Sequence, residues 1–167
     1  MIVKTIEGSL NAAGKRFAIV AARFNQRVVD ALVDGAVDCL ERHGMARDDL
    51  TIVRVPGAWE VPLALDELAS RGAVDGLIAL AVVIRGETSH FDYICGECSH
   101  GVARVSAQYR LPIGFGVLTC ESSAQAEARA GGKAGNKGWE AAQAAIEMVQ
   151  LVSQLRPSGS GESSGGA

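Results

Sequence analysis

The sequence predicts an α/β protein in which helices cover both faces of a parallel β-sheet. Short apolar runs of strand length alternate four times with segments of helical periodicity, and the connections are short. The run LIALAVVI at 77–84 has no polar alternation, which is typical of a strand buried on both faces. Right-handed crossovers then favour a flavodoxin-like three-layer α/β/α sandwich with a central four-stranded parallel sheet.

The individual elements follow from the spacing of apolar residues along the chain. The helix at 28–40 has its apolar residues three and four positions apart, and Gly44 beyond it is typical of a helix C-terminus. The strand at 113–118 comes directly after Pro112. In full, we expect strands at 16–22, 50–55, 77–84 and 113–118, and helices at 28–40, 61–69, 91–109, 123–130 and 138–155.

Both ends of the chain depart from this pattern. Residues 1–156 are expected to form one domain, since a chain of 167 residues suits one ordinary core. The first 14 residues are an N-terminal arm whose start is strand-like, and we expect it to pair with a neighbouring subunit rather than with its own sheet. The stretch 157–167 is a Gly/Ser tail with nothing to bury, so we expect it to be disordered.

Composition limits the classes of partner. Hydrophobic residues make up 48% and charged residues 21% of the chain, which is typical of a globular protein. The net charge of -3 argues against nucleic acid and anionic membranes, which call for a basic surface. The longest apolar run is too short to span a bilayer, and the first residues lack the layout of a signal peptide. We therefore expect small-molecule substrates, no membrane partner and a cytoplasmic location.

Chemically unusual residues gather just after the expected strands. In an open parallel sheet, ligands bind outside the carboxyl ends of the strands. The four segments that follow the strands are 23–25, 56–60, 85–90 and 119–121, and they contain most of the loop aromatics and several charged side chains. Four loops that converge on one edge predict a binding site there.

The loop after the third strand suggests phosphate binding and proton transfer. Gly86 lets the backbone approach a ligand, and the helix that follows Glu87 offers unpaired N–H groups to an anion. Thr88 adds a hydroxyl, although a plain helix N-cap is the alternative. A histidine titrates near neutrality, so His90 is a candidate for moving protons, although a lone histidine is often structural.

Residues on the other loops extend the candidate site. Phe24 and Trp59 lie on loops rather than core faces, where they either stack on a planar heterocycle or simply pack. Glu60 either accepts hydrogen bonds from sugar hydroxyls or favours the start of the next helix. In the glycine-rich segment before the last helix, Arg129 is suited to binding a phosphate, and Lys137 to binding a carbonyl or an anion. The alternative is that this segment is a flexible, solvated loop.

The cysteines offer a competing interpretation. Four cysteines in a chain of this size do not make a disulfide framework. Cys95 and Cys98 form a C-x-x-C followed by His100, which hints at a metal or redox site. These residues fall within one expected helix, and no second pair completes four ligands. We therefore interpret them as small helix residues and expect no metal.

Taken together, these stretches resemble the lumazine synthase family. The motifs R-F-N, P-G-A-W-E and V-I-R-G-E-T-S-H occur here in the family's order, and the combination is highly specific. The resemblance covers about residues 2–155, through the stretches at 6–8, 23–25, 55–62, 83–93, 115–119, 133–138 and 145–148. Two positions depart from a common pattern: Ala128 stands where many members have an acidic residue, and Trp59 where many have a smaller side chain.

The resemblance implies a transferase of riboflavin biosynthesis that needs no cofactor. Its reaction condenses 5-amino-6-(D-ribitylamino)uracil with (3S)-3,4-dihydroxy-2-butanone 4-phosphate and releases phosphate and water. The amine of the pyrimidine can form the imine itself, so no cysteine or lysine is expected to form a covalent intermediate.

The resemblance also implies roles for individual residues. Phe24 is expected to stack on the pyrimidine, and His90 to transfer protons. The ribityl side and heterocycle would be lined by Trp59, Glu60, Val83 and Ile84, and the phosphate bound by Gly86, Glu87 and Thr88. A neighbouring subunit would add Phe115, Lys137 and the phosphate-binding Arg129.

A site shared between subunits implies an oligomer. The resemblance implies a homopentamer, and it leaves open a 60-subunit shell and association with riboflavin synthase. Two alternatives from other functional classes remain: an inactive lumazine- or flavin-binding carrier or shell protein, and an FMN-binding flavodoxin-like protein. The second lacks the expected Ser/Thr-rich phosphate loop, because Phe24-Asn25-Gln26 follows the first strand.

Overall fold

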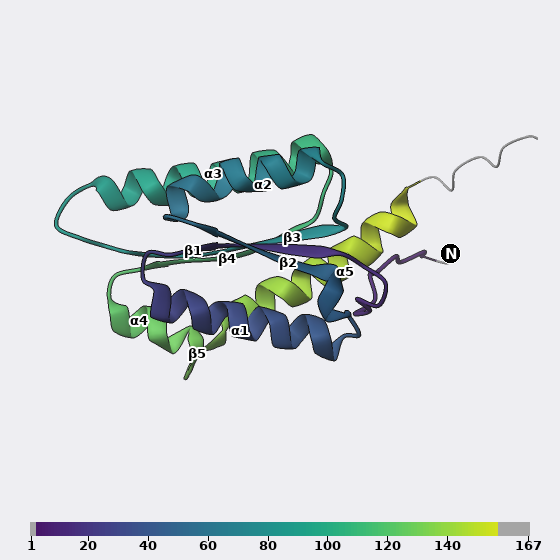
Figure 1. The fold of residues 1–167 in the computed structure, drawn as a ribbon, viewed down its shortest axis with the longest axis horizontal. Coiled ribbons are helices and arrows are strands. Elements are labelled where there is room, and N and C mark those ends of the chain that lie inside the picture. The colour runs from purple at the N-terminus through teal and green to yellow at the C-terminus, as the bar shows by residue number, and fades with distance from the viewer. Residues whose placement is uncertain (1–2, 157–167) are drawn as a thin grey trace, which may run out of the picture.

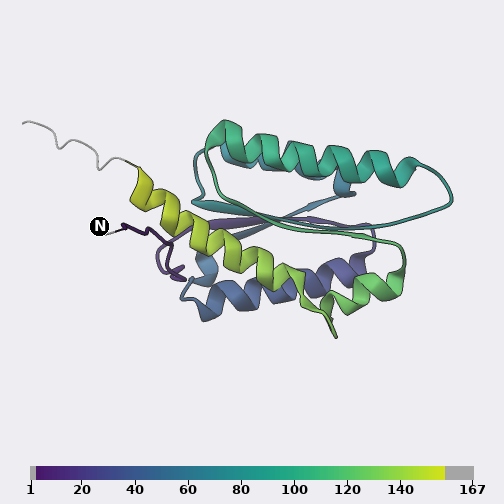
Figure 2. The same ribbon diagram turned by 180° about the vertical axis from the view of Figure 1, so that it is seen from behind.

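The computed structural model describes residues 3–156, and the predicted fold class is confirmed (Figure 1). Four parallel strands lie in the order β2–β1–β3–β4. Two helices cover one face of the sheet and three cover the other (Figure 2). The strands are β1 (Phe17–Ala22), β2 (Leu50–Val55), β3 (Gly76–Ile84) and β4 (Ile113–Cys120). The first face carries α2 (Val61–Ser70) and α3 (His90–Tyr109); the second carries α1 (Gln26–Arg42), α4 (Ser123–Ala128) and α5 (Lys137–Leu155).

Each face of the sheet has its own hydrophobic core. Along β1, Phe17 and Ile19 point to the core shared with α1 and α5, whereas Val20 points to the core shared with α2 and α3. This alternation is the two-residue period of a strand. β3 is fully buried from Gly76 to Val82, as its apolar run predicted. The two cores therefore fix the position of the strand ends from both sides.

Turn residues set the ends of α1. Asn25 precedes the helix in the left-handed conformation, with φ 57°, and Gly44 follows it with φ 95°. The backbone N–H of Met45 donates to the carbonyl of Leu40 at 3.1 Å, which closes the last turn. The predicted helix at 28–40 is thus confirmed, with one extra half-turn at each end.

The predicted helix at 123–130 is wrong at its C-terminal end. α4 ends at Ala128, and Ala130–Gly132 (β5) pairs antiparallel with Gly135–Asn136 (β6). Gly131 and Gly135 adopt φ values of 104° and 76°, a region open to glycine but unfavourable for other residues. The glycines therefore turn the chain where the preceding alanines alone favour a helix. Two short 3-10 helices complete the described elements: η1 (Arg47–Asp49) and η2 (Ala58–Glu60).

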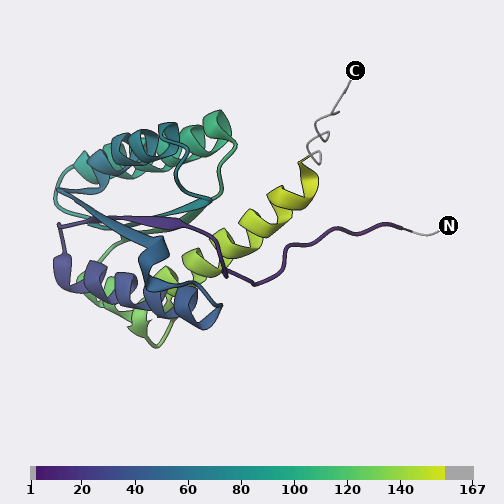
Figure 3. The same ribbon diagram turned by 45° about the vertical axis from the view of Figure 1, so that its right-hand side comes forward.

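The N-terminal segment runs out from the sandwich beside the last turns of α5 (Figure 3). Residues 3–14 form no strand in the described chain. Two side-chain amides of α5 hold this segment: Gln154 donates to the carbonyl of Glu7 at 3.0 Å, and Gln150 to that of Asn11 at 2.6 Å. Residues 1–2 and the predicted disordered tail, 157–167, lie outside the described residues. In residues 3–156, no helix combines the length and apolar character that crossing a membrane requires.

Candidate active site

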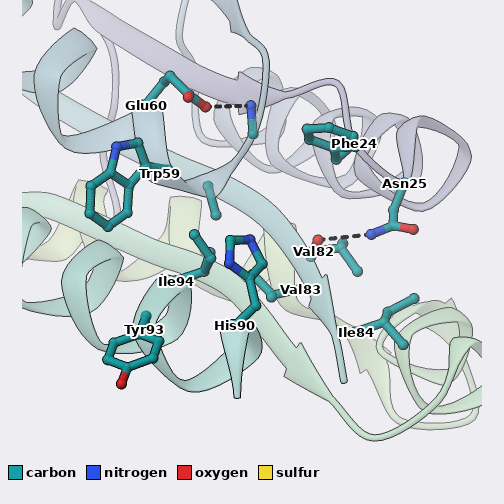
Figure 4. A pocket seen from close by; sticks show the side chains of 12 residues that line it. Phe24, Asn25, Trp59, Glu60, Val82, Val83, Ile84, His90, Tyr93 and Ile94 are labelled. Carbon is teal, nitrogen blue, oxygen red and sulfur yellow. Dashed lines mark hydrogen bonds between the residues drawn. The ribbon is translucent and has the colours of Figure 1, made fainter. Parts of the chain in front are cut away.

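The carboxyl ends of the four strands lie at one edge of the sheet, on the left in Figure 1. A cavity of about 740 Å³ opens there between the loops and α3 (Figure 4). The sequence predicted this edge as the binding site, and six predicted residues line the cavity: Phe24, Trp59, Glu60, Val83, Ile84 and His90. The remaining lining residues are Asn25, Gly57, Ala58, Val82, Tyr93 and Ile94.

Phe24 is held at the mouth of the cavity while most of its ring stays exposed. Its side chain is 70% exposed, so a face of the ring is open to a ligand. Its backbone N–H donates to the carbonyl of Pro56 at 3.0 Å, which ties the β1–α1 loop to the β2–η2 loop. An added Cβ on Gly57 would lie 2.8 Å from Cδ2 of Phe24, so the ring packs directly over a glycine. This arrangement presents a planar aromatic surface suited to stacking.

Asn25 joins the first loop to the third strand. Its side-chain Nδ2 donates to the carbonyl of Val82 at 2.9 Å (Figure 4). This bond satisfies a carbonyl near the end of β3 and fixes the left-handed turn that carries Phe24. The sequence motif contained Asn25, but its positioning role was not predicted. An asparagine at a strand-to-helix turn was the available signal, because this residue tolerates positive φ.

Glu60 is anchored through one carboxylate oxygen. Its Oε2 accepts a hydrogen bond from the backbone N–H of Gly57 at 2.9 Å. The carboxylate thus braces the η2 loop and keeps acceptor capacity for a hydroxyl, and it makes no capping hydrogen bond to α2. Trp59, beside it, is 56% exposed and lines the same cavity.

His90 and Tyr93 enter the cavity from the first turn of α3 (Figure 4). His90 is exposed, as expected for a group that exchanges protons with a ligand. Tyr93, 69% exposed, was not among the predicted site residues. Its position three residues after His90 places both on one face of the helix, which was the signal that could have identified it.

The predicted phosphate turn lies next to the cavity, but it does not line it. Gly86, Glu87 and Thr88 are all exposed in the β3–α3 loop. The helix N-cap is Ser89 rather than Thr88, so the N-cap alternative for Thr88 is wrong. The Thr88 hydroxyl oxygen instead lies 3.4 Å from the backbone nitrogen of His90. The Thr88 oxygen accepts this bond, so the hydroxyl hydrogen of Thr88 can still be donated to an anion.

Three predicted site residues lie away from this cavity in the same chain. Phe115, on β4, is 48% exposed and lines a separate hollow of about 320 Å³ against α3. Arg129, after α4, donates from Nη1 to the carbonyl of Gln125 at 3.0 Å. Lys137, at the start of α5, pairs with Glu140 at 2.7 Å. None of the described residues that line the cavity is a lysine or an arginine.

The cysteine motif does not converge into a site. Cys98 is fully buried in the core under α3, whereas His100 is exposed on the same helix. Burial raises the pKa of the Cys98 thiol to about 11, with Cys95 adding to the shift, and burial also raises the pKa of Cys95. Raised pKa values disfavour the thiolate that metal binding and redox chemistry require. Among residues 3–156, no three His, Cys, Asp or Glu side chains are grouped as metal ligands.

Comparison with known proteins identifies the family. The family model described as 6,7-dimethyl-8-ribityllumazine synthase matches residues 14–153. The chain is 54% identical over 153 residues to a protein of that name from Desulfovibrio desulfuricans, covering 92% of this chain and 98% of the relative. For the proteins of the same name from Aquifex aeolicus and Nitratidesulfovibrio vulgaris, the identities are 56% over 150 residues and 55% over 153. These matches cover 90% and 92% of this chain, and 97% and 98% of the relatives.

The matches confirm the predicted family and, with it, an enzyme of the transferase class. They span both the loops that build the cavity and the cationic segment that lies outside it. The chain belongs to the 6,7-dimethyl-8-ribityllumazine synthase family.

Proposed function

We propose that this chain condenses 5-amino-6-(D-ribitylamino)uracil with (3S)-3,4-dihydroxy-2-butanone 4-phosphate in the penultimate step of riboflavin biosynthesis. The products are 6,7-dimethyl-8-ribityllumazine, inorganic phosphate and water. One observation carries the proposal: a single cavity brings together an open aromatic face at Phe24, the carboxylate of Glu60 and the imidazole of His90, with an exposed phosphate turn beside it.

The cavity suits the pyrimidine. Phe24 offers its exposed ring for stacking, and the end of β3 at Val83 and Ile84 offers backbone groups to the edge of the heterocycle. Glu60 has one carboxylate oxygen free of the loop, which can accept hydrogen bonds from ribityl hydroxyls. Trp59 gives this side an apolar wall. Stacking and hydrogen bonding would hold the amine in one orientation toward the second substrate.

The phosphate would bind at the β3–α3 loop. Gly86 and Glu87 offer backbone N–H groups, and Thr88 offers its hydroxyl near the N-terminus of α3. A phosphate held there would place the butanone carbonyl between the turn and the pyrimidine, within reach of His90. His90 would then move protons during imine formation, phosphate elimination and ring closure. The substrate's own amine is the nucleophile, so the chain needs to supply orientation and proton transfer only.

A second copy of the chain would complete the site. A phosphate calls for a cation, and the cavity contains no lysine or arginine among the described residues. Arg129 and Lys137 are partly exposed on the α4–α5 segment, and Phe115 is half-exposed on β4. We propose that a neighbouring subunit brings these three side chains to the cavity, within a homopentamer.

The N-terminal arm has a fitting partner on the surface. β2 is an outer strand of the four-stranded sheet, and its Thr51 and Ile52 are exposed. An unpaired strand edge can accept an added strand, so the arm of a neighbouring subunit is proposed to pair there. Assembly into a 60-subunit shell, association with riboflavin synthase and a cytoplasmic location stay predictions.

The direct test is the rate of lumazine formation from both substrates, followed by absorbance and corrected for the spontaneous reaction. We expect a rate well above background, lost in Arg129→Ala and reduced in His90→Ala. Arg42→Ala is the matched control, because Arg42 pairs with Asp38 at the other end of the sandwich. A background rate from a folded oligomer that still binds lumazine would instead indicate a carrier or shell protein.

A further inference from the structure

The β3–α3 loop has few contacts of its own to hold it in place. All residues from Gly86 to His90 are exposed. The hydrogen bond from the backbone N–H of His90 to Thr88 is long, at 3.4 Å, and that from Asp92 to the carbonyl of Ser89 merely starts the helix. A loop with so few contacts would sample many conformations. To bind a phosphate, however, the backbone N–H groups of the loop must converge on one point.

Arg85 supplies the missing contacts from the position directly before the loop. Its backbone N–H donates to the carbonyl of Cys120 at 2.9 Å, and its Nε donates to Oε2 of Glu121 at 2.9 Å. Its Nη1 reaches Oδ1 of Asp92, beyond the loop, at 3.2 Å. The guanidinium carbon lies 4.2 Å from the centre of the Phe91 ring. One side chain thus joins the two ends of the loop and ties both to the end of β4.

We propose that Arg85 is a positioning residue that holds the turn at Gly86–Thr88 in its phosphate-binding shape through Glu121 and Asp92. This inference rests on the proposed function, since the phosphate is that of the butanone substrate. The planar guanidinium suits the role, because its separate N–H groups reach two carboxylates while its face covers an aromatic ring. A lysine has one compact charge and cannot do all three.

A direct contact between Arg85 and the phosphate is the competing role, and the two roles predict opposite effects of the carboxylates. If Arg85 bound the phosphate itself, Glu121 and Asp92 would compete with the substrate for the guanidinium. Removing either carboxylate would then lower the KM for the butanone phosphate. If Arg85 positions the turn, removing either carboxylate loosens the loop and raises that KM.

The experiment measures KM for each substrate and kcat in four variants: Arg85→Gln, Arg85→Lys, Glu121→Gln and Asp92→Asn. From partly exposed ion pairs and one cation–π contact, we expect KM for the butanone phosphate to rise about ten-fold in Arg85→Gln and about three-fold in each carboxylate variant. KM for the pyrimidine should stay unchanged. In Arg85→Lys, the KM for the butanone phosphate should stay close to the raised value of Arg85→Gln. Arg42→Gln, which removes another arginine–carboxylate pair, is the matched control and should leave all constants unchanged.

Three outcomes would overturn the proposal. A lower KM in Glu121→Gln and Asp92→Asn, or near-complete recovery in Arg85→Lys, would assign Arg85 to the phosphate directly. Equal rises in KM for both substrates, together with a lower melting temperature, would show that the contacts of Arg85 with Glu121 and Asp92 only stabilise the fold.

A second readout separates this inference from the proposed function. Millisecond hydrogen exchange of peptides covering residues 86–90 does not depend on catalysis. Faster exchange in Glu121→Gln than in the unmodified chain is expected, and unchanged exchange would contradict a positioning role. An inactive unmodified enzyme would count against the proposed function alone, whereas this exchange result would still decide whether Arg85 orders the loop.

Discussion

At the scale of single residues, the orientation of Phe24 depends on the absence of a side chain at Gly57. A methyl group there would meet the ring at 2.8 Å, and the exposed ring would swing aside. Gly57→Ala should therefore raise KM for the pyrimidine about three- to ten-fold while the fold is retained, because a small misplacement of a stacking group weakens binding. Steady-state kinetics with each substrate varied in turn would measure this.

The control for this change is Gly96→Ala, where an added Cβ has no neighbour within 4 Å. Unaltered KM values in Gly57→Ala would show that the position of Phe24 does not matter for pyrimidine binding.

His90 is expected to act on the rate rather than on binding. It lines the cavity and is exposed. In the proposed reaction, the amine of the pyrimidine can form the imine without a nucleophile from the protein. His90→Gln should lower kcat by about ten- to a hundred-fold, at or below the lower end for proton transfer by a side chain, with both KM values nearly unchanged. Rapid-quench or absorbance kinetics at saturating substrates would measure it. An unchanged kcat with raised KM values would make His90 a binding residue only.

The buried thiol of Cys98 should make stability sensitive to alkaline pH. Burial raises its pKa from 9.0 to about 11, so the folded state disfavours the thiolate more than the unfolded chain does. The corresponding stability is fully present below pH 9 and is lost as the pH rises from 9 to 11. Urea unfolding should show a shallower decline over this range in Cys98→Ala than in the unmodified chain. Equal declines in the free energy of unfolding of the two proteins would show that the Cys98 thiol does not cause the loss of stability.

The sequence predicted those site residues whose chemistry is unusual on a loop, such as Phe24, Glu60 and His90. It did not reveal Gly57 and Asn25, because their contributions lie in a close approach and in one hydrogen bond to the Val82 carbonyl. Both depend on how separate loops meet in space. Residue type alone does not encode that geometry.

At the scale of elements, the start of α5 is fitted closely against α1. Asn136 caps α5 by accepting from the backbone N–H of Gly138 at 2.9 Å, and its Nδ2 donates to the carbonyl of Ala31 at 2.9 Å. A Cβ at Gly138 would collide with the carbonyl of Leu32. The contact also fixes Lys137, whose backbone N–H donates to the carbonyl of Arg129 at 2.8 Å.

Gly138→Ala should therefore destabilise the fold by about 1–3 kcal/mol, as overpacking against backbone does. Gly96→Ala, inside α3 with open space around it, should instead stabilise by about 0.5–1 kcal/mol through helix propensity. Thermal or urea unfolding of both variants would measure the contrast. A neutral effect of Gly138→Ala would show that α1 and α5 can separate without loss.

Apolar periodicity predicted the elements whose faces are buried, and β2 was placed at its observed bounds, Leu50–Val55. The hairpin of β5 and β6 was missed because it packs few apolar side chains and is set by the positive φ angles of Gly131 and Gly135. Short alanine-rich sequence before these glycines favours helix locally. The conformations of the two glycines outweigh this helix propensity and produce the hairpin.

At the scale of the whole molecule, the proposed function divides the site into two parts that one chain does not bring together. The cavity has the aromatic faces and the histidine, while Arg129, Lys137 and Phe115 lie outside it. The fold and the family could be predicted from the sequence of one chain. The contacts between copies could not, because they depend on surface residues, which the spacing of apolar residues does not describe. The central claim is therefore that each working site combines residues of two chains.

Complementation between two variants of strongly reduced activity tests this claim most directly. His90→Ala and Arg129→Ala chains would be unfolded together in equal amounts, reassembled and assayed for lumazine formation. If each site takes His90 from one chain and Arg129 from another, about a quarter of randomly assembled sites are intact, and activity should rise to about a quarter of the unmodified level. If both residues act within one chain, the mixture would show only the mean of the two single variants, and the shared site would be contradicted.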